Sequence, residues 1–207
     1  MENLTIIQHA LIQRNLTLLR DRRTPHGEFR RLLHQTASLL AYEVLRDLPV
    51  RAVEIETPLE PTVGYVLDTE VVVVPILRAG LGMVDGFVQY LPEARIGHLG
   101  IYRDEATHRP VDYYAKLPPG LERAWVIVID PMLATGGSAD DALSSLKARG
   151  ARQLRFVCLV AAPEGVRRLA DRHPDVRLYA AALDRELNRH AFILPGLGDA
   201  GDRVFGT

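Results

Sequence analysis

Apolar residues near the amino terminus recur at the spacing of an amphipathic helix. A first such segment runs from about His9 to Arg20. Thr24 then precedes Pro25, and we expect Thr24 to be the N-cap of a second helix with Pro25 in its first turn. The apolar positions of that second helix are Phe29, Leu32, Leu33, Leu40 and Val44. The pattern therefore predicts helices in residues 1–50.

After Pro49 the apolar positions change to a period of two. Val53, Ile55 and Thr57 alternate with polar residues, and beyond the segment PLEP the alternation resumes at Val63, Tyr65 and Leu67. Alternation of this kind is typical of antiparallel strands with one exposed face. Residues 51–68 are therefore predicted to form a two-stranded β-arm.

From residue 71 the strands are predicted by continuous apolar runs, namely VVVVPI, AWVIVID, LRFVCLVAA and, more weakly, VRLYAAAL. Strands buried on both faces of a sheet have this composition. The segments between them, such as GSADDALSSLKARG and PEGVRRLADRHP, have helical length and pattern. The predicted fold class is α/β, an open and mostly parallel sheet flanked by helices.

One domain is expected over 1–207, with the helical segment in 1–50, the β-arm in 51–68, the α/β core in 69–182 and a C-terminal loop in 183–207. In open α/β sheets, ligands bind where the carboxyl ends of the strands lead into loops. The loops after Ile76, Ile129 and Ala162 are therefore the expected places for a site.

Composition narrows the class of protein. The chain has 207 residues, of which 47% are apolar and 25% charged, and its formal net charge is −1. Such balance predicts neither a nucleic acid nor a membrane surface as partner. Cys158 is the only cysteine, and its setting in FVCLVAA indicates a buried hydrophobe rather than a nucleophile. With apolar runs too short to span a bilayer and no leader-like N-terminus, we expect a cytoplasmic protein.

The segment Gly196–Gly201, GLGDAG, matches the dinucleotide-binding fingerprint G-x-G-x-x-G. That fingerprint requires a helix after the glycines, a second strand and an acidic residue about 20 positions further on. Only six residues follow Gly201, so we expect no room for a helix or for the other features. The glycines are predicted to serve another purpose.

The most informative loop follows the run AWVIVID. A predicted strand ends at Asp130, and Thr135-Gly136-Gly137-Ser138 leads directly into a predicted helix. Backbone amides at a helix N-terminus, with glycines that allow close approach, form an anion site. No lysine follows the glycines, so the segment is not a Walker loop. A carboxylate five residues before this nest fits a ligand with ribose hydroxyls and a 5′-phosphate, whereas the alternative is a structural turn with Asp130 as a cap.

The segment DPMLATGGS resembles the phosphoribosyl diphosphate motif of the type I phosphoribosyltransferases. Together with VVPILRAGLGM, IYRDEAT, LVAAPEG and PGLGDAGDRVFGT it resembles the uracil phosphoribosyltransferase family, from about residue 70 to the last residue. The resemblance implies transfer of ribose 5-phosphate from phosphoribosyl diphosphate to uracil, giving UMP and diphosphate. It also implies a homodimer or higher homo-oligomer, and it raises the question of a GTP effector.

The resemblance also assigns residues to the two substrates. For phosphoribosyl diphosphate these are Arg78, Ala79, Gly80, Arg103, Asp130, Pro131, Met132, Leu133, Ala134, Thr135, Gly136, Gly137, Ser138 and Asp199. For uracil, bound chiefly through main-chain groups, they are Ile193, Gly198, Asp199 and Ala200. Asp130, Arg103 and Asp199 are the catalytic candidates.

Residue chemistry is consistent with these roles. Positive charge develops at the sugar while a diphosphate leaves, so the site needs cations near the leaving group and a carboxylate near the ribose. Arg78 and Arg103 are the candidate cations, although Arg78 could instead form an ion pair at a helix start. Arg103 opens the polar segment YRDEATHRPVDYY, which has no strong period and is interpreted as a loop, either a lid that excludes water or a plain surface loop.

Phosphoribosyltransferases of other specificities usually carry two adjacent acids where this chain has Asp130-Pro131. We therefore expect Mg²⁺ to be held mainly by diphosphate oxygens, sugar hydroxyls and water. The seven histidines lack zinc-type spacing. Asp199 could accept the proton from the base nitrogen, stabilise charge at the sugar, or only brace the loop in an Asx-type turn.

Two other functions remain open. One is an RNA-binding regulator of the pyrimidine-attenuation type on the same fold, which the balanced charge and Pro131 argue against. The other is a purine phosphoribosyltransferase, which differs in the base that it accepts.

Overall fold

The structure is a computed structural model that describes residues 3–103 and 110–207, with side chains described outside 101–113. Its centre is a parallel sheet in the order β1-β11-β10-β8-β4-β5, and β9 pairs with β10. These strands are β1 (Leu4–Ile6), β4 (Val71–Pro75), β5 (Arg95–Ile96), β8 (Trp125–Ile129), β9 (Met132–Leu133), β10 (Gln153–Ala161) and β11 (Arg177–Leu183). The predicted α/β class is confirmed.

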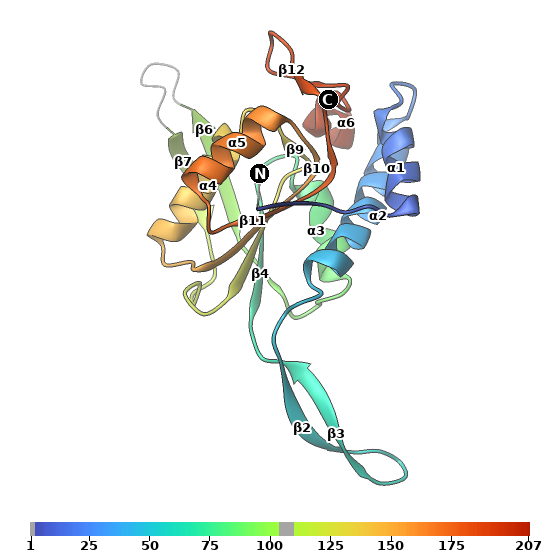
Figure 1. Ribbon diagram of the computed structural model, residues 1–207, viewed down its shortest axis with the longest axis vertical. Helices are drawn as coiled ribbons and strands as arrows, with labels where there is room; N and C mark the ends of the chain where they lie inside the picture. Colours follow the sequence, from blue (N-terminus) through green and yellow to red (C-terminus); the bar gives the residue numbers. More distant parts are fainter. Residues whose placement is uncertain (1–2, 104–109) are drawn as a thin grey trace.

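Helices cover both faces of this sheet (Figure 1). They are α1 (Ala10–Arg20), α2 (His26–Val44), α3 (Leu81–Val88), α4 (Gly137–Ala148), α5 (Pro163–Arg172) and α6 (Ala200–Phe205). Side chains of successive strand residues point to opposite faces of the sheet, so they pack into two separate hydrophobic cores. Val71 and Val73 pack with α1, α2, α3 and α6, whereas Val72 and Val74 pack with α4 and α5. Burial on both faces explains why β4 and β8 are apolar at every position, whereas β10 also holds the buried Arg155.

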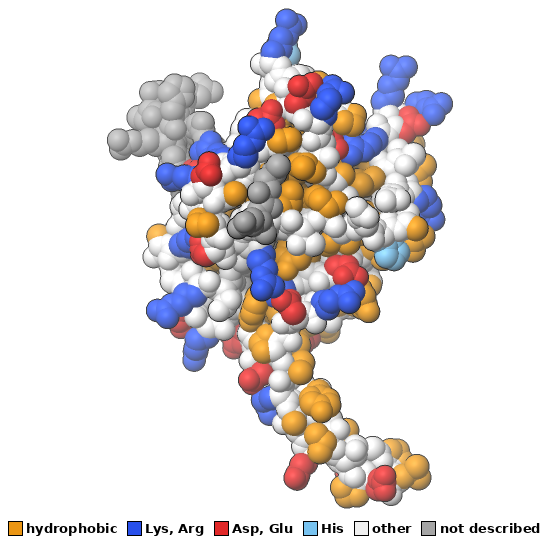
Figure 2. All heavy atoms as spheres, viewed as in Figure 1, with side chains coloured by type: hydrophobic (Ala, Val, Ile, Leu, Met, Phe, Trp, Pro, Cys, Tyr) orange, Lys and Arg blue, Asp and Glu red, His pale blue; other side chains and the backbone are white. Residues whose placement is uncertain are grey.

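The predicted arm is an antiparallel pair, β2 (Val50–Glu56) and β3 (Pro61–Leu67), in register from Val50 opposite Leu67 to Glu56 opposite Pro61. It projects from the body of the molecule, as Figure 1 shows. Apolar side chains lie along its surface (Figure 2), and Leu59 at its turn is 94% exposed. The alternating pattern thus located the pair correctly, but the arm is solvated on both faces rather than on one.

The N-cap prediction at Thr24 is wrong. The Thr24 hydroxyl donates to the carbonyl of Leu18 at 2.6 Å, at the end of α1, and Pro25 is the N-cap of α2. The Thr24 side chain is thus bound to the end of α1, and the cap position of α2 falls one residue later, on Pro25, with no side-chain cap hydrogen bond. At the start of α1, the N-cap is His9, whose ring Nδ1 accepts the Leu11 amide at 3.1 Å.

Two further elements differ from the sequence pattern. The segment interpreted as a polar loop, residues 102–114, includes the end of β6 (His98–Arg103) and most of β7 (Pro110–Lys116), which pair as antiparallel strands. In the C-terminal segment, α6 begins at Ala200 and includes Gly201, so the expectation that no helix fits there is wrong. A six-residue helix needs little more than one turn, and Asp199 supplies its cap.

Candidate active site

The carboxyl ends of β4 and β8 and the C-terminal segment line one cavity of about 250 Å³. Its lining comprises Ala79, Asp130, Met132, Ala134, Ala191, Phe192, Ile193, Gly198, Asp199, Ala200 and Gly201. All four residues expected at uracil are among them, together with five of those expected at phosphoribosyl diphosphate. Ala191, Phe192 and Gly201 were not predicted, because no charge or motif distinguishes their role. Segments more than a hundred residues apart in sequence therefore meet where the fold class places a ligand.

Asp130 follows the last residue of β8 and faces this cavity half-buried. Its Oδ1 accepts the Met132 amide at 3.2 Å, a bond within the turn after the strand. Burial raises the pKa of Asp130 to about 7, and the Met132 hydrogen bond offsets only part of this rise. The residue does not cap α4, whose N-cap is Gly136. A desolvated carboxyl in a cavity is a candidate functional group, because hydroxyl donors or positive charge from a ligand would stabilise its ionised form.

The predicted phosphate nest is a tight turn at the start of α4. Gly136 has φ of 77°, the left-handed region, and a Cβ on it would lie 3.1 Å from the Gly165 carbonyl oxygen. A Cβ on Gly165 would in turn lie 2.5 Å from the Ala134 oxygen, so α5 packs directly on the loop. Thr135 and Ser138 are exposed on either side of buried glycines. The loop thus presents hydroxyls and a helix N-terminus at one place, as an anion site requires.

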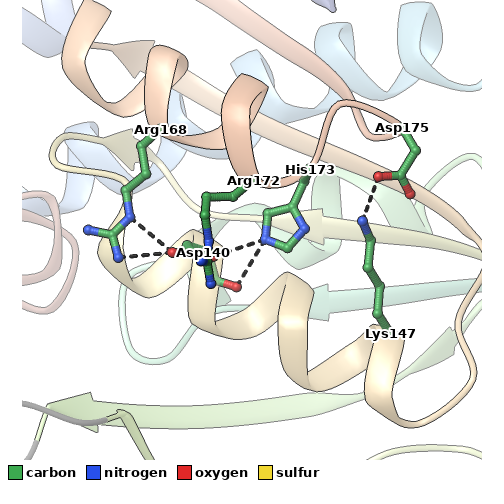
Figure 3. Close-up of polar contacts among 6 residues, drawn as sticks. All are labelled: Asp140, Lys147, Arg168, Arg172, His173 and Asp175. Atoms are coloured by element: carbon green, nitrogen blue, oxygen red, sulfur yellow. Dashed lines mark hydrogen bonds and ion pairs between the residues drawn. The ribbon is translucent and has the colours of Figure 1, made fainter.

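Asp140, in the first turn of α4, connects this helix to side chains of α5 and of the residue after it (Figure 3). Its buried carboxylate accepts hydrogen bonds from Arg168 at 2.9 and 3.0 Å and from His173 Nε2 at 3.0 Å, and Arg172 lies 3.4 Å away. Burial raises the pKa of Asp140, but the hydrogen bonds from Arg168 and His173 and the nearby Arg172 charge together lower it. The ionised carboxylate therefore ties α4 to α5. The sequence signal that could have shown this is the pair of arginines four residues apart on α5.

The other predicted donor-site residues after β8 have structural surroundings. The carbonyl of Pro131 accepts the amides of Leu159 and Val160 at 3.0 and 3.2 Å, which fixes the turn to β10. Leu133 is buried in β9. Pro131 and Leu133 therefore hold the conformation of the loop, and they would contact a ligand only through main-chain atoms.

Arg78 lies in the loop after β4, next to the cavity residue Ala79. Its side chain is mostly exposed, 3.6 Å from Asp202 Oδ1, and its guanidinium lies 5.9 Å from the Phe205 ring centre. The anticipated helix-start ion pair thus exists, but with α6 rather than α3. Gly80 packs on β8, where a Cβ would lie 2.6 Å from the Ile129 oxygen. The weak, exposed pair leaves Arg78 able to turn toward a phosphate.

Arg103 is the last residue of β6, and its side chain lies outside the described residues. Its predicted role at the diphosphate therefore stays a prediction. The loop interpretation is corrected for residues 102–103 and 110–114, which belong to β6 and β7, while residues 104–109 lie outside the described part of the chain.

Asp199 is exposed at the mouth of the cavity and is the N-cap of α6. Its Oδ1 accepts the Asp202 amide at 3.0 Å, which is the bracing role anticipated for it. Oδ2 is the oxygen left to meet a ligand. Beside it Gly198 has φ of 78°, while Ile193 and Ala200 are buried.

Comparison with known proteins agrees with this geometry. The family model for uracil phosphoribosyltransferase matches residues 6–207. The chain belongs to the uracil phosphoribosyltransferase family. It is 60% identical over 207 residues to a uracil phosphoribosyltransferase from Salinibacter ruber, covering 100% of this chain and 99% of the relative. One from Dictyoglomus thermophilum is 55% identical over 203 residues, covering 98% of each.

Solved structures show the same fold. The AQ2163 protein from Aquifex aeolicus superposes with a TM-score of 0.92 at 35% identity, covering 99% of this chain and 98% of that one. A hypoxanthine-guanine phosphoribosyltransferase from Bacillus anthracis superposes with a TM-score of 0.51 at 14% identity, covering 77% and 80%. The latter likeness extends to the fold alone, the type I phosphoribosyltransferase fold.

Proposed function

We propose that the protein transfers ribose 5-phosphate from 5-phospho-α-D-ribose 1-diphosphate to uracil, giving UMP and diphosphate. The observation that carries this proposal is one cavity lined both by Asp130, beside the phosphate nest, and by the loop Gly198–Gly201. A phosphoribosyl donor bound at Asp130 and the nest would therefore lie next to a base bound at the loop. Family membership supports uracil as the base.

The donor's 5′-phosphate would bind the main-chain amides of Thr135–Ser138 at the N-terminus of α4. The carboxylate of Asp130 would accept the ribose hydroxyls and oppose the positive charge that develops at the anomeric carbon. Arg78, and Arg103 on the family resemblance, would balance the charge on the leaving diphosphate. Each of these groups acts most strongly as charge separates, which is what favours the transition state.

Uracil presents two carbonyl acceptors on either side of an N–H donor. Main-chain groups of residues 198–200 would pair with this edge, and Ile193 would pack against the ring. The bond from the base nitrogen to the anomeric carbon forms as the bond to diphosphate oxygen breaks with its electron pair. Asp199 Oδ2 would take the proton that the nitrogen loses, directly or through water.

We also propose Mg²⁺ as the cofactor, arriving with the donor. Across residues 3–103 and 110–207, no group of three or more His, Cys, Asp or Glu side chains is placed to hold a metal ion. Of the two carboxylates that line the cavity, Asp130 would bind the ribose and Asp199 would serve the base. A reluctantly dehydrated ion held by diphosphate oxygens and water fits such a site, where it would neutralise the leaving group.

A homodimer is proposed on the exposed apolar surface of the arm. The large apolar side chains exposed there are Val50, Ile55, Leu59, Val63, Tyr65 and Val66. At the base of the arm lies a hollow of about 350 Å³ that includes Leu45, Leu48 and Leu91. Exposed apolar surface of this kind marks interaction sites. Sedimentation analysis should show a dimer that Leu59→Glu with Tyr65→Glu converts to a monomer.

We further propose a GTP effector and a cytoplasmic location. A GTP effector is supported by the family resemblance alone, and GTP titration into the assay tests it. A cytoplasmic location is proposed because Cys158, the single cysteine of the sequence, is a free thiol buried in the core on β10. In the described part of the chain, no helix combines the length and apolarity needed to cross a bilayer.

The proposal is tested by incubating the protein with phosphoribosyl diphosphate, Mg²⁺ and uracil. UMP and diphosphate should appear in equal amounts, and Asp130→Asn should suppress both. If no nucleotide forms but the protein retains RNA on a filter in a salt-dependent manner, the regulator alternative holds instead.

A further inference from the structure

Both backbone polar groups of Gly196, at the start of the base loop, are bound by one ion pair from distant parts of the chain. Arg20, in the last turn of α1, donates from Nη1 to the Gly196 carbonyl at 2.7 Å. The Gly196 amide donates to Asp184 Oδ2 at 2.9 Å. Arg20 and Asp184 are joined to each other by hydrogen bonds of 2.6 and 2.8 Å. The ion pair therefore encloses the Gly196 backbone.

This ion pair is rigidly placed. Asp184 is buried directly after β11, and its own amide donates to the Ala161 carbonyl at 2.8 Å, which ties it to β10. A bidentate arginine and carboxylate pair fixes orientation as well as distance. Because the carboxylate is buried, removing the guanidinium leaves a poorly compensated charge. The sheet thus holds Asp184, and Asp184 holds Arg20.

The turn that the pair encloses connects two lining residues of the cavity. Gly196 has φ of 62°, and a Cβ on it would collide with the Ile193 carbonyl oxygen, so the turn is tight. Ile193 lies before the turn and Gly198 after it, and both line the cavity. A shift of Gly196 would therefore move the groups proposed to face uracil.

Arg203, from α6, holds the next residue of the loop. It donates to the Leu197 carbonyl at 2.8 Å and to the Asp21 carbonyl at 2.7 Å, and it also contacts the Leu19 carbonyl. Its guanidinium lies 4.3 Å from the centre of the Phe29 ring, which packs it from one side. Two arginines thus bind consecutive loop residues to the end of α1.

We propose that Arg20 is a positioning residue for the base. Arg20 does not line the cavity. Together with Asp184 it fixes the position of the loop whose main-chain groups would bind uracil. α1 thereby determines base affinity without contacting the ligand. The inference rests on the proposed function and adds to it a residue from outside the motifs that define the site.

The test compares Arg20→Gln and Arg20→Lys with the control Arg23→Gln. Arg23 also pairs with a carboxylate, Asp21 at 2.7 Å, but on the surface of the neighbouring turn. We expect Arg20→Gln to raise the KM for uracil about tenfold, the worth of one or two hydrogen bonds. The KM for phosphoribosyl diphosphate should stay unchanged. Arg20→Lys should give an intermediate uracil KM, because one ammonium cannot span both Asp184 and Gly196, and Arg23→Gln should resemble wild type.

An Arg20→Gln protein with a lowered melting temperature and an unchanged uracil KM would overturn the proposal and leave Arg20 as a structural brace. Hydrogen exchange gives a readout that does not depend on turnover. Amides in the peptide covering residues 193–199 should exchange faster in Arg20→Gln than in Arg23→Gln, and equal exchange would also overturn the proposal. If the wild-type protein forms no UMP, the proposed function fails, whereas exchange still decides whether Arg20 holds the loop.

Discussion

Asp199 Oδ1 accepts a hydrogen bond from the amide of Asp202 at 3.0 Å, so the ionisable side chain of the base loop also caps a helix. Asparagine caps helices as well as aspartate does, but it cannot accept a proton or carry charge. Asp199→Asn is therefore expected to keep the melting temperature and lose turnover. Asp199→Ala should lose both. Near-normal turnover in the Asn variant would reduce Asp199 to scaffolding.

Asp130 gives a prediction about stability. Its pKa is about 7 in the folded protein and close to 3.8 in the unfolded chain, so the folded state holds this proton more tightly. Stability should fall as pH rises from about 4 to 7 and stay low above that. Asp130→Asn removes this loss. Without ligands, the variant and the wild type should have similar free energies of unfolding at pH 4. At pH 8 that of the variant should be about 1–3 kcal/mol higher.

The same substitution tests the chemistry at Asp130. Asparagine keeps the shape of the side chain but not the charge that opposes the developing cation, so turnover should fall about 10²-fold. Stopped assays of UMP at saturating substrates measure this loss. A variant that is more stable yet fully active would remove Asp130 from the mechanism.

Asp140 and Asp175 form a matched pair for testing what holds α4 to α5 (Figure 3). Asp140→Ala deprives the buried His173 ring of its shorter acceptor, while Arg168 and Arg172 stay partly solvated, so the cost should be about 2 kcal/mol. Asp175→Ala breaks the exposed Lys147 pair at 2.6 Å and should cost less than about 1 kcal/mol. Urea unfolding of both variants measures the difference, and equal losses would contradict it.

The sequence pattern predicted the long strands of the central sheet, because burial requires apolar residues there. Strands β4, β8, β10 and β11 coincide with the continuous apolar runs, because a strand covered on both faces is built mainly of apolar residues. Local pattern did not predict β1, which has three residues and gains its structure by pairing with β11. It also missed β6 and β7, because their sequence shows no regular alternation of apolar and polar residues that would predict the pairing.

The site divides in the same way. Residues within motifs, such as Asp130 and Gly198, were predicted to lie together, and they line one cavity. Arg20 and Asp184, which are 164 positions apart, belong to no motif, so their ion pair could be found only in three dimensions. Asp199 shows a third case, because its sequence allowed bracing and catalysis, and the structure shows the bracing bond while leaving Oδ2 for the ligand.

Uracil transfer itself is tested most directly by a base panel. Phosphoribosyl diphosphate and Mg²⁺ are supplied with uracil, cytosine, hypoxanthine or orotate, and nucleotide products are separated and quantified. Only uracil should be converted. Cytosine carries an amine where uracil carries an acceptor and lacks the neighbouring proton, and each buried mismatch costs about 1–3 kcal/mol. Orotate needs a cation for its carboxylate, and GLGDAG contains none. Comparable turnover of cytosine and uracil, or preference for hypoxanthine, would contradict the account.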